Sequence, residues 1–281
     1  MFVSIKEMLD EAYRQKNAVG AFMLWTYDSA RAIAEAADEL SRPVIYIIGE
    51  DGCKYLGGFS NVRKIVELAT AGMKIPVALH ADHFSSYEAI VGAIEGGFTS
   101  VMIDASRYPL EKNIEITSQI VEYASRHKIS VEAELGRLPG NEGDIDVPDA
   151  EAFQTDPDEA RLFVKHTGID CLAVSIGTVH GAYSSEPKIN IPRVKLISEA
   201  VGMPLVMHGG SGTPDDKVVE AVENGICKVN IATELVTIMG KTISEVQQTP
   251  QFRYRIENLY EPARTACKEL VKEKIKLLGR M

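Results

Sequence analysis

Short apolar segments, many of them rich in β-branched residues, alternate with longer amphipathic segments along almost the whole chain. Eight apolar segments are predicted as strands: Val19–Trp25, Pro43–Ile48, Val77–Leu79, Ser100–Ile103, Ser130–Leu135, Cys171–Ile176, Pro204–Met207 and Lys228–Ile231. The segments between them have a helical apolar period and are predicted as helices: Ser29–Leu40, Val62–Thr70, Tyr87–Glu95, Asn113–His127, Pro157–Thr167, Pro192–Ala200 and Pro214–Asn224. Strands that alternate with helices pair in parallel. A count of eight favours a closed (β/α)8 barrel, the TIM barrel, over an open doubly wound sheet.

The length of 281 residues fits one such barrel, because this fold takes about 250 residues. We therefore predict a single domain over residues 1–281, with extra C-terminal helix at Glu261–Leu278 that packs on the barrel or on a partner subunit. The connection Gly136–Thr155 is long, polar and acidic, and it is predicted to be functional or mobile.

The formal charge of −10 argues against a general nucleic-acid or membrane-surface binder, because such proteins need a basic surface. It leaves room for a small anionic substrate, since backbone N–H groups at helix N-termini bind anions locally. The N-terminus has no signal-peptide pattern and no apolar run has transmembrane length, so a soluble cytoplasmic protein is expected. Four widely spaced cysteines are expected as isolated buried thiols: Cys53, Cys171, Cys227 and Cys267.

Histidine is scarce, and three of the six histidines follow predicted strands three, six and seven. These are His83, His180 and His208. The carboxyl ends of barrel strands converge on one mouth, where active sites lie. Three imidazoles with an open position are typical of a catalytic Zn²⁺ site, because imidazole suits borderline metals. The alternative is a hydrogen-bonded or acid–base histidine cluster without metal.

Carboxylates accompany these histidines. Asp82 directly precedes His83 and could exchange a proton with a substrate oxygen polarised by the ion, or could instead cap the following helix. Glu132 and Glu134 alternate in one strand, so both are predicted to point into the barrel. Glu134, nearer the mouth, is a candidate alternate ligand. Glu132 is expected in an inner polar network, or a second metal site, with Asp104.

Two turns after predicted strands seven and eight are candidates for a phosphate site, because barrels commonly bind phosphate there. The first, HGGSGTP, spans His208–Pro214, and the second, VNIATE, spans Val229–Glu234. The glycines permit close backbone approach, and Ser211 and Thr233 supply hydroxyl groups. Glycine is also common wherever the backbone takes a left-handed conformation, so the glycines alone are weak evidence for a phosphate site. The position of these turns after strands seven and eight is the stronger argument.

Six motifs in order resemble the class II, metal-dependent fructose- and tagatose-bisphosphate aldolases: LHADHFSS, SVMIDAS, SVEAELGRL, IGTVHGAYSSEP, LVMHGGSG and KVNIATEL. The resemblance covers nearly the whole chain, from Ala18 to about Leu278. It implies that three histidines bind Zn²⁺, with Glu134 available when the ion shifts; these are His83, His180 and His208. The ion would chelate the carbonyl and hydroxyl oxygens of dihydroxyacetone phosphate and stabilise its enediolate as a Lewis acid.

The same resemblance implies roles for further residues. Asp82 would exchange a proton with the C4 hydroxyl, Glu142 in the long connection would move the C3 proton, and Asn230 would hydrogen-bond the enediolate. The phosphate would be held by Gly181, Gly209, Ser211 and Thr233. Family members often bind a monovalent cation, Na⁺ or K⁺, near that phosphate, and they form homodimers or homotetramers.

The departures from the family pattern lie on the aldehyde side. Met23 stands where Asn usually follows G-A-F, Gly49–Gly52 replaces a small hydroxyl-bearing pattern, and Arg107 stands where His is usual. The usual Asp-Pro-Arg element near the C-terminus, from which a neighbouring subunit supplies an arginine to the distal phosphate, is absent. The candidate substitutes are Arg253, Arg255 and Arg264.

Three hypotheses follow. The leading one is a Zn²⁺-dependent aldolase that releases dihydroxyacetone phosphate from a ketose 1-phosphate or 1,6-bisphosphate of the fructose or tagatose type. The second keeps this chemistry for a ketose 1-phosphate without a distal phosphate. The third is a non-catalytic, chaperone-like subunit, which would be expected to lack metal ligands or the acidic residue that Asp82 supplies here.

Overall fold

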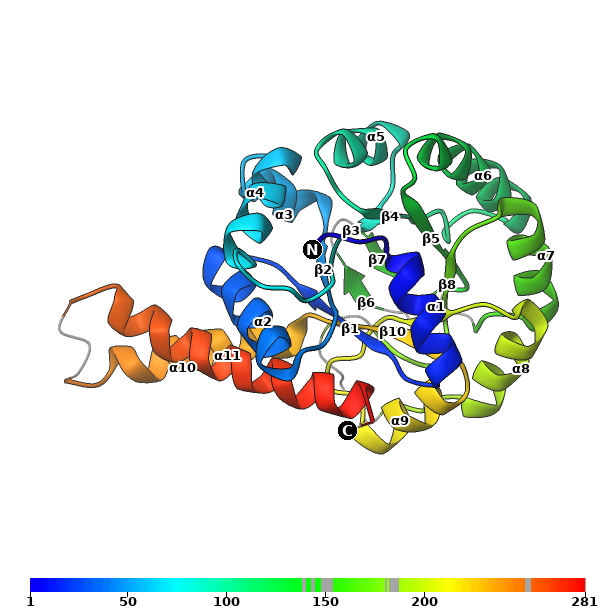
Figure 1. Ribbon diagram of the computed structural model, residues 1–281. Coiled ribbons are helices and arrows are strands. Elements are labelled where there is room, and N and C mark those ends of the chain that lie inside the picture. Colours follow the sequence, from blue (N-terminus) through cyan, green and yellow to red (C-terminus); the bar gives the residue numbers. More distant parts are fainter. Residues whose placement is uncertain are drawn as a thin grey trace.

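The structure, a computed structural model, describes residues 1–137, 140–142, 145–147, 154–179, 181, 187–250 and 254–280, with backbone only for 140–142 and 145–147. Eight strands form a closed barrel in the order β1-β10-β9-β8-β5-β4-β3-β2, and all the neighbouring pairs are parallel (Figure 1). The barrel strands are β1 (Val19–Met23), β2 (Val44–Ile48), β3 (Val77–Phe84), β4 (Ser100–Ile103), β5 (Ser130–Leu135), β8 (Cys171–Val174), β9 (Leu205–Met207) and β10 (Ile226–Ile231). The predicted TIM barrel is confirmed.

Helices surround the barrel (Figure 1). In chain order they are α1 (Ile5–Gln15), α2 (Tyr27–Leu40), α3 (Glu50–Tyr55), α4 (Phe59–Ala69), α5 (Tyr87–Glu95), α6 (Leu110–Arg126), α7 (Pro157–Thr167), α8 (Ile191–Val201), α9 (Asp215–Glu223), α10 (Thr233–Gln247) and α11 (Glu257–Leu278). Side-chain caps fix several starts: Ser86 accepts a hydrogen bond from the Ala89 N–H at the start of α5, and Asp156 caps α7. The predicted C-terminal helix is present but begins earlier, at Glu257.

Helices α10 and α11 form an antiparallel pair whose connected ends project beyond the barrel (orange to red in Figure 1). The inner part of α11 packs against α2. Inside the long connection that the sequence predicted, a short antiparallel pair is formed by β6 (Gly140–Glu142) and β7 (Ile145–Val147).

Strand β3 extends five residues beyond the predicted end at Leu79, as far as Phe84. The prediction stopped where the apolar run stopped. The strand continues because the polar side chains of His80 and Asp82 point into the barrel, where other polar groups meet them. Helices α1 and α3 were not predicted from the sequence.

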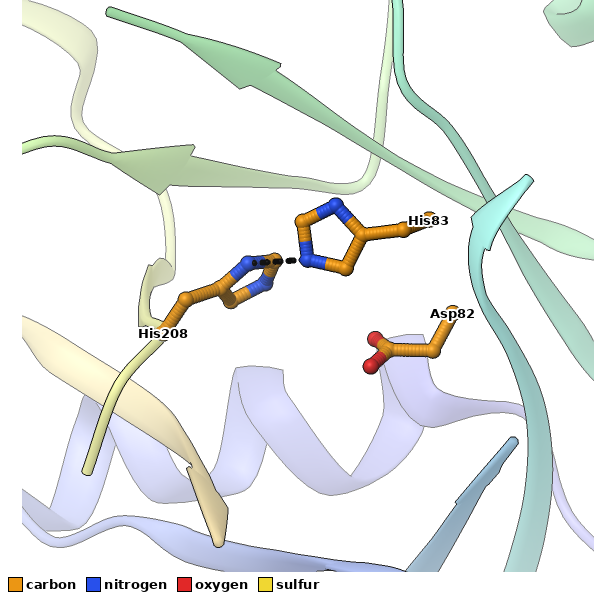
Figure 2. A group of neighbouring side chains, drawn as sticks. All are labelled: Asp82, His83 and His208. Carbon is orange, nitrogen blue, oxygen red and sulfur yellow. Dashed lines mark hydrogen bonds between the residues drawn. The ribbon is translucent and has the colours of Figure 1, made fainter. Parts of the chain in front are cut away.

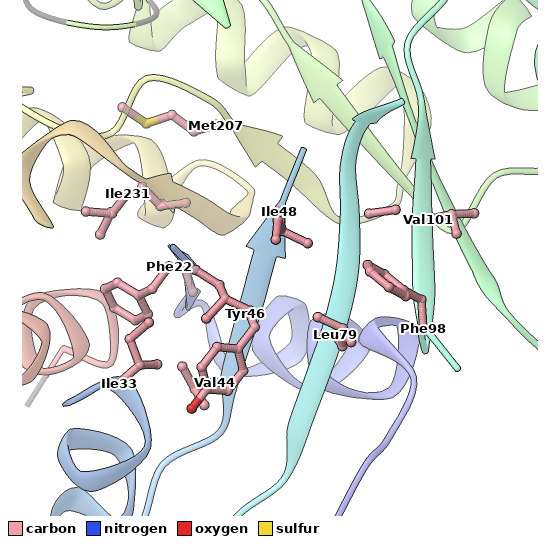
Figure 3. Packing of buried hydrophobic residues seen from close by; sticks show 14 of the residues in the cluster. Phe22, Ile33, Val44, Tyr46, Ile48, Leu79, Phe98, Val101, Met207 and Ile231 are labelled. Atoms are coloured by element: carbon pink, nitrogen blue, oxygen red, sulfur yellow. The ribbon is translucent and has the colours of Figure 1, made fainter. Parts of the chain in front are cut away.

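Two apolar clusters build the core. One fills the start of the barrel interior with small and β-branched side chains, including Ala21, Ala78 and Val206, and α1 closes it from outside through Ile5 and Leu9. The other lies between the strands and the surrounding helices (Figure 3): Phe22, Ile33, Val44, Tyr46, Ile48, Leu79, Phe98, Val101, Met207 and Ile231 are among its members. Each fully buried large side chain contributes about 1.5–3 kcal/mol. Apolar residues thus close one end of the interior and leave the other end to polar groups.

The four cysteines are buried free thiols, as predicted. Among the described residues, helices both long and apolar enough to cross a membrane are absent.

Candidate metal centre and substrate site

Asp82 and His83 are consecutive in β3, yet both side chains reach the same cluster (Figure 2). Alternation in a regular strand would send them to opposite faces. His83 has φ +52°, in the left-handed region that non-glycine residues rarely adopt, and the β3–β4 register shifts between Ala81 and Phe84. This irregularity lets neighbouring residues face one site, and such backbone strain is typical of functional positions.

His83 of β3 and His208, directly after β9, meet across the barrel mouth. His83 Nε2 lies 2.8 Å from His208 Nδ1 (Figure 2). The other nitrogen of each ring faces a carboxylate: His83 Nδ1 lies 2.8 Å from Asp104 Oδ2, and His208 Nε2 lies 2.9 Å from Glu132 Oε1. An ionised carboxylate only accepts hydrogen bonds, so each of these ring nitrogens keeps its proton and donates a hydrogen bond to its carboxylate. The two nitrogens that face each other form one hydrogen bond, which needs a further proton on one of the two rings.

Two bare nitrogen lone pairs at 2.8 Å would repel each other, so this contact requires a cation: the proton shared in the hydrogen bond or, with the rings further apart, a metal ion that replaces it. Burial and the nearby His83 oppose a charge on His208, but hydrogen bonds to Glu132 and Glu134 outweigh them and raise the pKa of His208 to about 9. Burial would raise the pKa of Asp104, but its hydrogen bond from His83 holds that pKa well below its ordinary value. The site therefore attracts positive charge, and its donor set fits a metal ion.

Other donors complete this cluster. Ligand atoms of Asp82, His83 and His208 lie within 4.8 Å of one another, as do those of His83, Asp104 and Glu134. Glu134, the predicted alternate ligand, is buried and has its Oε2 atom 3.3 Å from His208 Nδ1. One volume at the carboxyl ends of the strands is thus surrounded by five side chains: Asp82, His83, Asp104, Glu134 and His208.

Asp82 is oriented by Asn230 of β10. The Asn230 Nδ2 group donates to both Asp82 carboxylate oxygens, at 3.1 and 3.3 Å, and both residues are buried. The two residues that the sequence assigned to proton transfer and hydrogen bonding are therefore direct neighbours, 148 positions apart in the chain.

A second polar layer lies deeper in the barrel. Lys228 is fully buried and its Nζ lies 2.9 Å from Glu132 Oε2. His80 lies between this pair and Asp82, with Nε2 at 3.6 Å from Glu132 and 3.8 Å from Asp82, and its Nδ1 bonds to Ser100. Burial lowers the pKa of Lys228, but the Glu132 and Asp82 carboxylates outweigh it and raise that pKa, so Lys228 is charged.

The sequence predicted Glu132 in an inner polar network, or a second metal site, with Asp104. Glu132 lies in this deeper layer, but Asp104 bonds to His83 and Ser106 instead, and Lys228 and the role of His80 were missed. A signal existed. Three strands carry a polar residue two positions before a site residue, as in His80-Ala-Asp82, Glu132-Ala-Glu134 and Lys228-Val-Asn230. The period of two places each earlier residue on the same inward face, one layer deeper.

The predicted phosphate residues come together beside the mouth. Gly181, Ser211 and Thr233 line one cavity of about 870 Å³. Ser211 Oγ accepts hydrogen bonds from the N–H groups of Ala232 and Glu234, which join the two turns. This arrangement puts hydroxyl groups at the N-terminus of α10, where anions are favoured.

Gly209 adjoins these residues, and its glycine identity has a structural cause. Its φ is +67°, and a Cβ there would lie 2.4 Å from the backbone oxygen of Val179. Two predicted site residues are not placed: His180 lies outside the described residues, as does the Glu142 side chain, although the Glu142 backbone belongs to β6.

A parallel eight-stranded barrel with buried histidines and carboxylates at the carboxyl ends of its strands defines a metal-dependent barrel enzyme. The family model described as "Fructose-bisphosphate aldolase class-II" matches residues 3–281. The chain therefore belongs to the class II fructose-bisphosphate aldolase family, and it is a metal-dependent lyase.

Individual proteins agree with this assignment. The fructose-bisphosphate aldolase of Geobacillus stearothermophilus is 42% identical over 279 residues, which cover 99% of this chain and 96% of the relative. Among solved structures, the YdjI aldolase of Escherichia coli K12 is 36% identical with a TM-score of 0.87, covering 99% of this chain and 98% of that one. A putative fructose-1,6-biphosphate aldolase of Coccidioides immitis is 29% identical with a TM-score of 0.89, covering 97% and 95%.

Proposed function

We propose that this chain reversibly cleaves a ketose 1-phosphate or 1,6-bisphosphate of the fructose or tagatose type to dihydroxyacetone phosphate and an aldehyde. The observation that carries the proposal is the pair of facing ring nitrogens of His83 and His208 beside the buried Asp82 carboxylate. With His180, these histidines would hold Zn²⁺, and Glu134 would be an alternate ligand. The ion would supply Lewis-acid polarisation of the substrate carbonyl.

Asp82 would act on the substrate directly. As the C3–C4 bond breaks, its carboxylate would take the proton of the C4 hydroxyl, and the C4 carbon would leave as the aldehyde. Asn230 holds this carboxylate in place by its amide N–H group, and it would hydrogen-bond the oxygens of the three-carbon fragment. Glu142 would return a proton to C3.

The phosphate end would bind at the turns after β9 and β10. Gly181, Ser211 and Thr233 line the same cavity, and Gly209 permits the close turn between them and the metal centre. We extend the proposal to a monovalent cation, Na⁺ or K⁺, near this phosphate and to a homodimer or homotetramer, on the basis of the family resemblance.

Chelation tests the leading proposal. Metal-free protein is expected to lose cleavage of fructose or tagatose 1,6-bisphosphate, and added Zn²⁺ to restore it, with the dihydroxyacetone phosphate measured by a coupled assay. Undiminished cleavage in protein whose metal content has been shown to be negligible would refute the proposal.

A ketose 1-phosphate without a distal phosphate is a second candidate substrate, and the loop after β2 favours it. A Cβ at Gly49 would lie 3.8 Å from the Asp82 backbone oxygen, so this loop borders the proposed proton-transfer residue. The next residue, Glu50, accepts a hydrogen bond from the Ser85 N–H, at 3.2 Å. An acidic side chain here disfavours a second phosphate.

The arginines considered as ligands of a distal phosphate also favour a substrate without one. Arg255 is paired with Glu257 at 2.8 Å, and Arg264 lies 3.9 Å from Asp28, while Arg253 lies outside the described residues. Comparison of kcat/KM for fructose 1,6-bisphosphate and fructose 1-phosphate decides between the candidates. A large preference for the bisphosphate would eliminate the second.

A further inference from the structure

Lys228 is a fully buried cation inside the barrel, and its position is unusual because a buried lysine costs free energy unless its charge is balanced. Its Nζ lies 2.9 Å from Glu132 Oε2, and both side chains have no exposed surface. Lys228 comes from β10 and Glu132 from β5, which are not neighbours in the barrel. The ion pair therefore crosses the barrel interior.

The two oxygens of Glu132 have different partners. Oε2 faces the Lys228 ammonium, and it also accepts from the Cys171 thiol at 3.6 Å. Oε1 lies 2.9 Å from His208 Nε2. The carboxylate thus connects a fixed cation on one side to a proposed metal ligand on the other.

This connection decides which nitrogen of His208 faces the metal centre. While Glu132 accepts a hydrogen bond from Nε2, that nitrogen keeps its proton, and Nδ1, which faces His83, is the nitrogen left for a metal ion. Lys228 is needed to keep an ionised carboxylate at this depth. Removing it leaves an uncompensated buried charge at Glu132, which is strongly unfavourable.

His80, Asp82 and Glu132 also form a buried cluster whose ligand atoms lie within 4.8 Å of one another. The Lys228 ammonium already supplies positive charge there, since it pairs with Glu132 and is attracted to Asp82. The deeper layer thus has a built-in cation.

We propose that Lys228 is a positioning residue: its ion pair with Glu132 fixes the hydrogen bond that His208 Nε2 donates to Glu132 and so presents His208 Nδ1 to the metal. The inference rests on the proposed role of His208 as a ligand. Lys228 acts through two other residues and does not touch the substrate.

The test is Zn²⁺ affinity, measured by competition with a chromophoric chelator, in wild type, Lys228→Met and Lys228→Arg. Loss of an outer partner of a ligating histidine weakens metal binding about 10–100-fold, so we expect this weakening in Lys228→Met and a smaller one in Lys228→Arg. Ser130→Ala is the matched control, because Ser130 is a buried residue of the same strand as Glu132 and bonds to Ser4 instead. Its affinity should equal that of wild type.

The outcomes separate the two proposals. A wild-type protein that binds no Zn²⁺ would refute the proposed function itself. A wild type that binds Zn²⁺, with a Lys228→Met protein that binds it within about twofold as tightly, would overturn the positioning role alone, because a 10–100-fold loss is expected.

A folding defect in Lys228→Met would not stop the test. The double variant Lys228→Met/Glu132→Gln removes both buried charges, and exchange of a buried pair for neutral groups is often tolerated. We expect it to fold, as judged by circular dichroism of the metal-free protein, and still to bind Zn²⁺ more weakly than wild type. Wild-type affinity in the double variant would show that Lys228 merely neutralises Glu132, and would overturn the inference.

Discussion

His83 Nε2 lies 2.8 Å from His208 Nδ1, although the two residues are 125 positions apart. Their opposite nitrogens each donate a hydrogen bond to a carboxylate, so the contact between the facing nitrogens needs one further proton or a metal ion. The geometry is one in which a cation between the rings gains from both lone pairs. It explains why two histidines with buried side chains lie among four buried carboxylates: Asp82, Asp104, Glu132 and Glu134.

Replacement of one of these rings should empty the centre. We expect His208→Ala to lose bound Zn²⁺ and to lower kcat/KM for aldol cleavage by at least about 10³-fold, because Lewis-acid polarisation supplies several kcal/mol. His127→Ala is the control, since His127 ends α6 and stacks on Tyr123. Metal analysis and a coupled assay measure both effects. Stoichiometric zinc in His208→Ala would contradict the assignment of His208 as a ligand.

Asp82 should be separable from metal binding. Asp82→Asn keeps a similar shape beside Asn230 but cannot take a proton, so kcat should fall about 10²–10⁴-fold while the zinc content stays near that of wild type. Asp158→Asn, an exposed change in α7, should leave both unchanged. If Asp82→Asn retained more than about a tenth of wild-type kcat, general acid–base catalysis by Asp82 would be ruled out.

The barrel was predictable because its strands are buried on both faces and appear as apolar runs. Where a strand turns polar, that signal fails. β3 was predicted to end at Leu79, but His80 and Asp82 continue it into the polar layer. Helix α1 was missed because its apolar residues, such as Leu9, cover the barrel end rather than follow a strand.

The site was predictable only in part. Scarcity and strand-end position identified His83 and His208, and the glycine turns indicated the phosphate region. The hydrogen bond between His208 and Glu132 could not be predicted, because it depends on which strands lie across the barrel from each other. The left-handed φ of His83 could not be predicted either, because a histidine in a sequence does not by itself indicate this backbone conformation.

Gly209 should not tolerate a side chain. In Gly209→Ala the new Cβ would lie 2.4 Å from the Val179 backbone oxygen, at a φ of +67° that favours glycine, so we expect a loss of more than about 1 kcal/mol in unfolding free energy. Substrate KM should rise as well, since the turn leads to Ser211. Urea denaturation and steady-state kinetics measure the two effects.

Gly240→Ala provides the matched control for that substitution. Gly240 lies inside α10, and a Cβ there has nothing within 4 Å. Alanine is favoured over glycine in a helix by about 0.5–1 kcal/mol, so this variant should be as stable as wild type or more stable. Equal stability of the two variants would mean that the turn at Gly209 can relax around a Cβ.

The contact between α2 and α11 should respond to acid through Glu39. Hydrogen bonds from Lys268 and Lys272, each 2.8 Å from this carboxylate, lower the pKa of Glu39 to about 2. An unfolded chain would have a glutamate pKa of about 4.3, so the stabilisation is present above that pH and is lost as the pH falls toward 2. Because the group is partly exposed, we expect Glu39→Gln to cost about 0.5–1 kcal/mol at pH 7.

The loss of stability in Glu39→Gln should also decrease under two independent conditions. The stability difference between wild type and Glu39→Gln, measured by urea denaturation, should decrease steadily as the pH is lowered from 6 to about 3. In this range Glu39 is protonated in the unfolded chain but stays ionised in the native protein, which favours unfolding. It should also be small in a Lys268→Gln/Lys272→Gln background, where the cations are gone. A constant difference across this pH range would assign the loss to packing between α2 and α11 instead of charge.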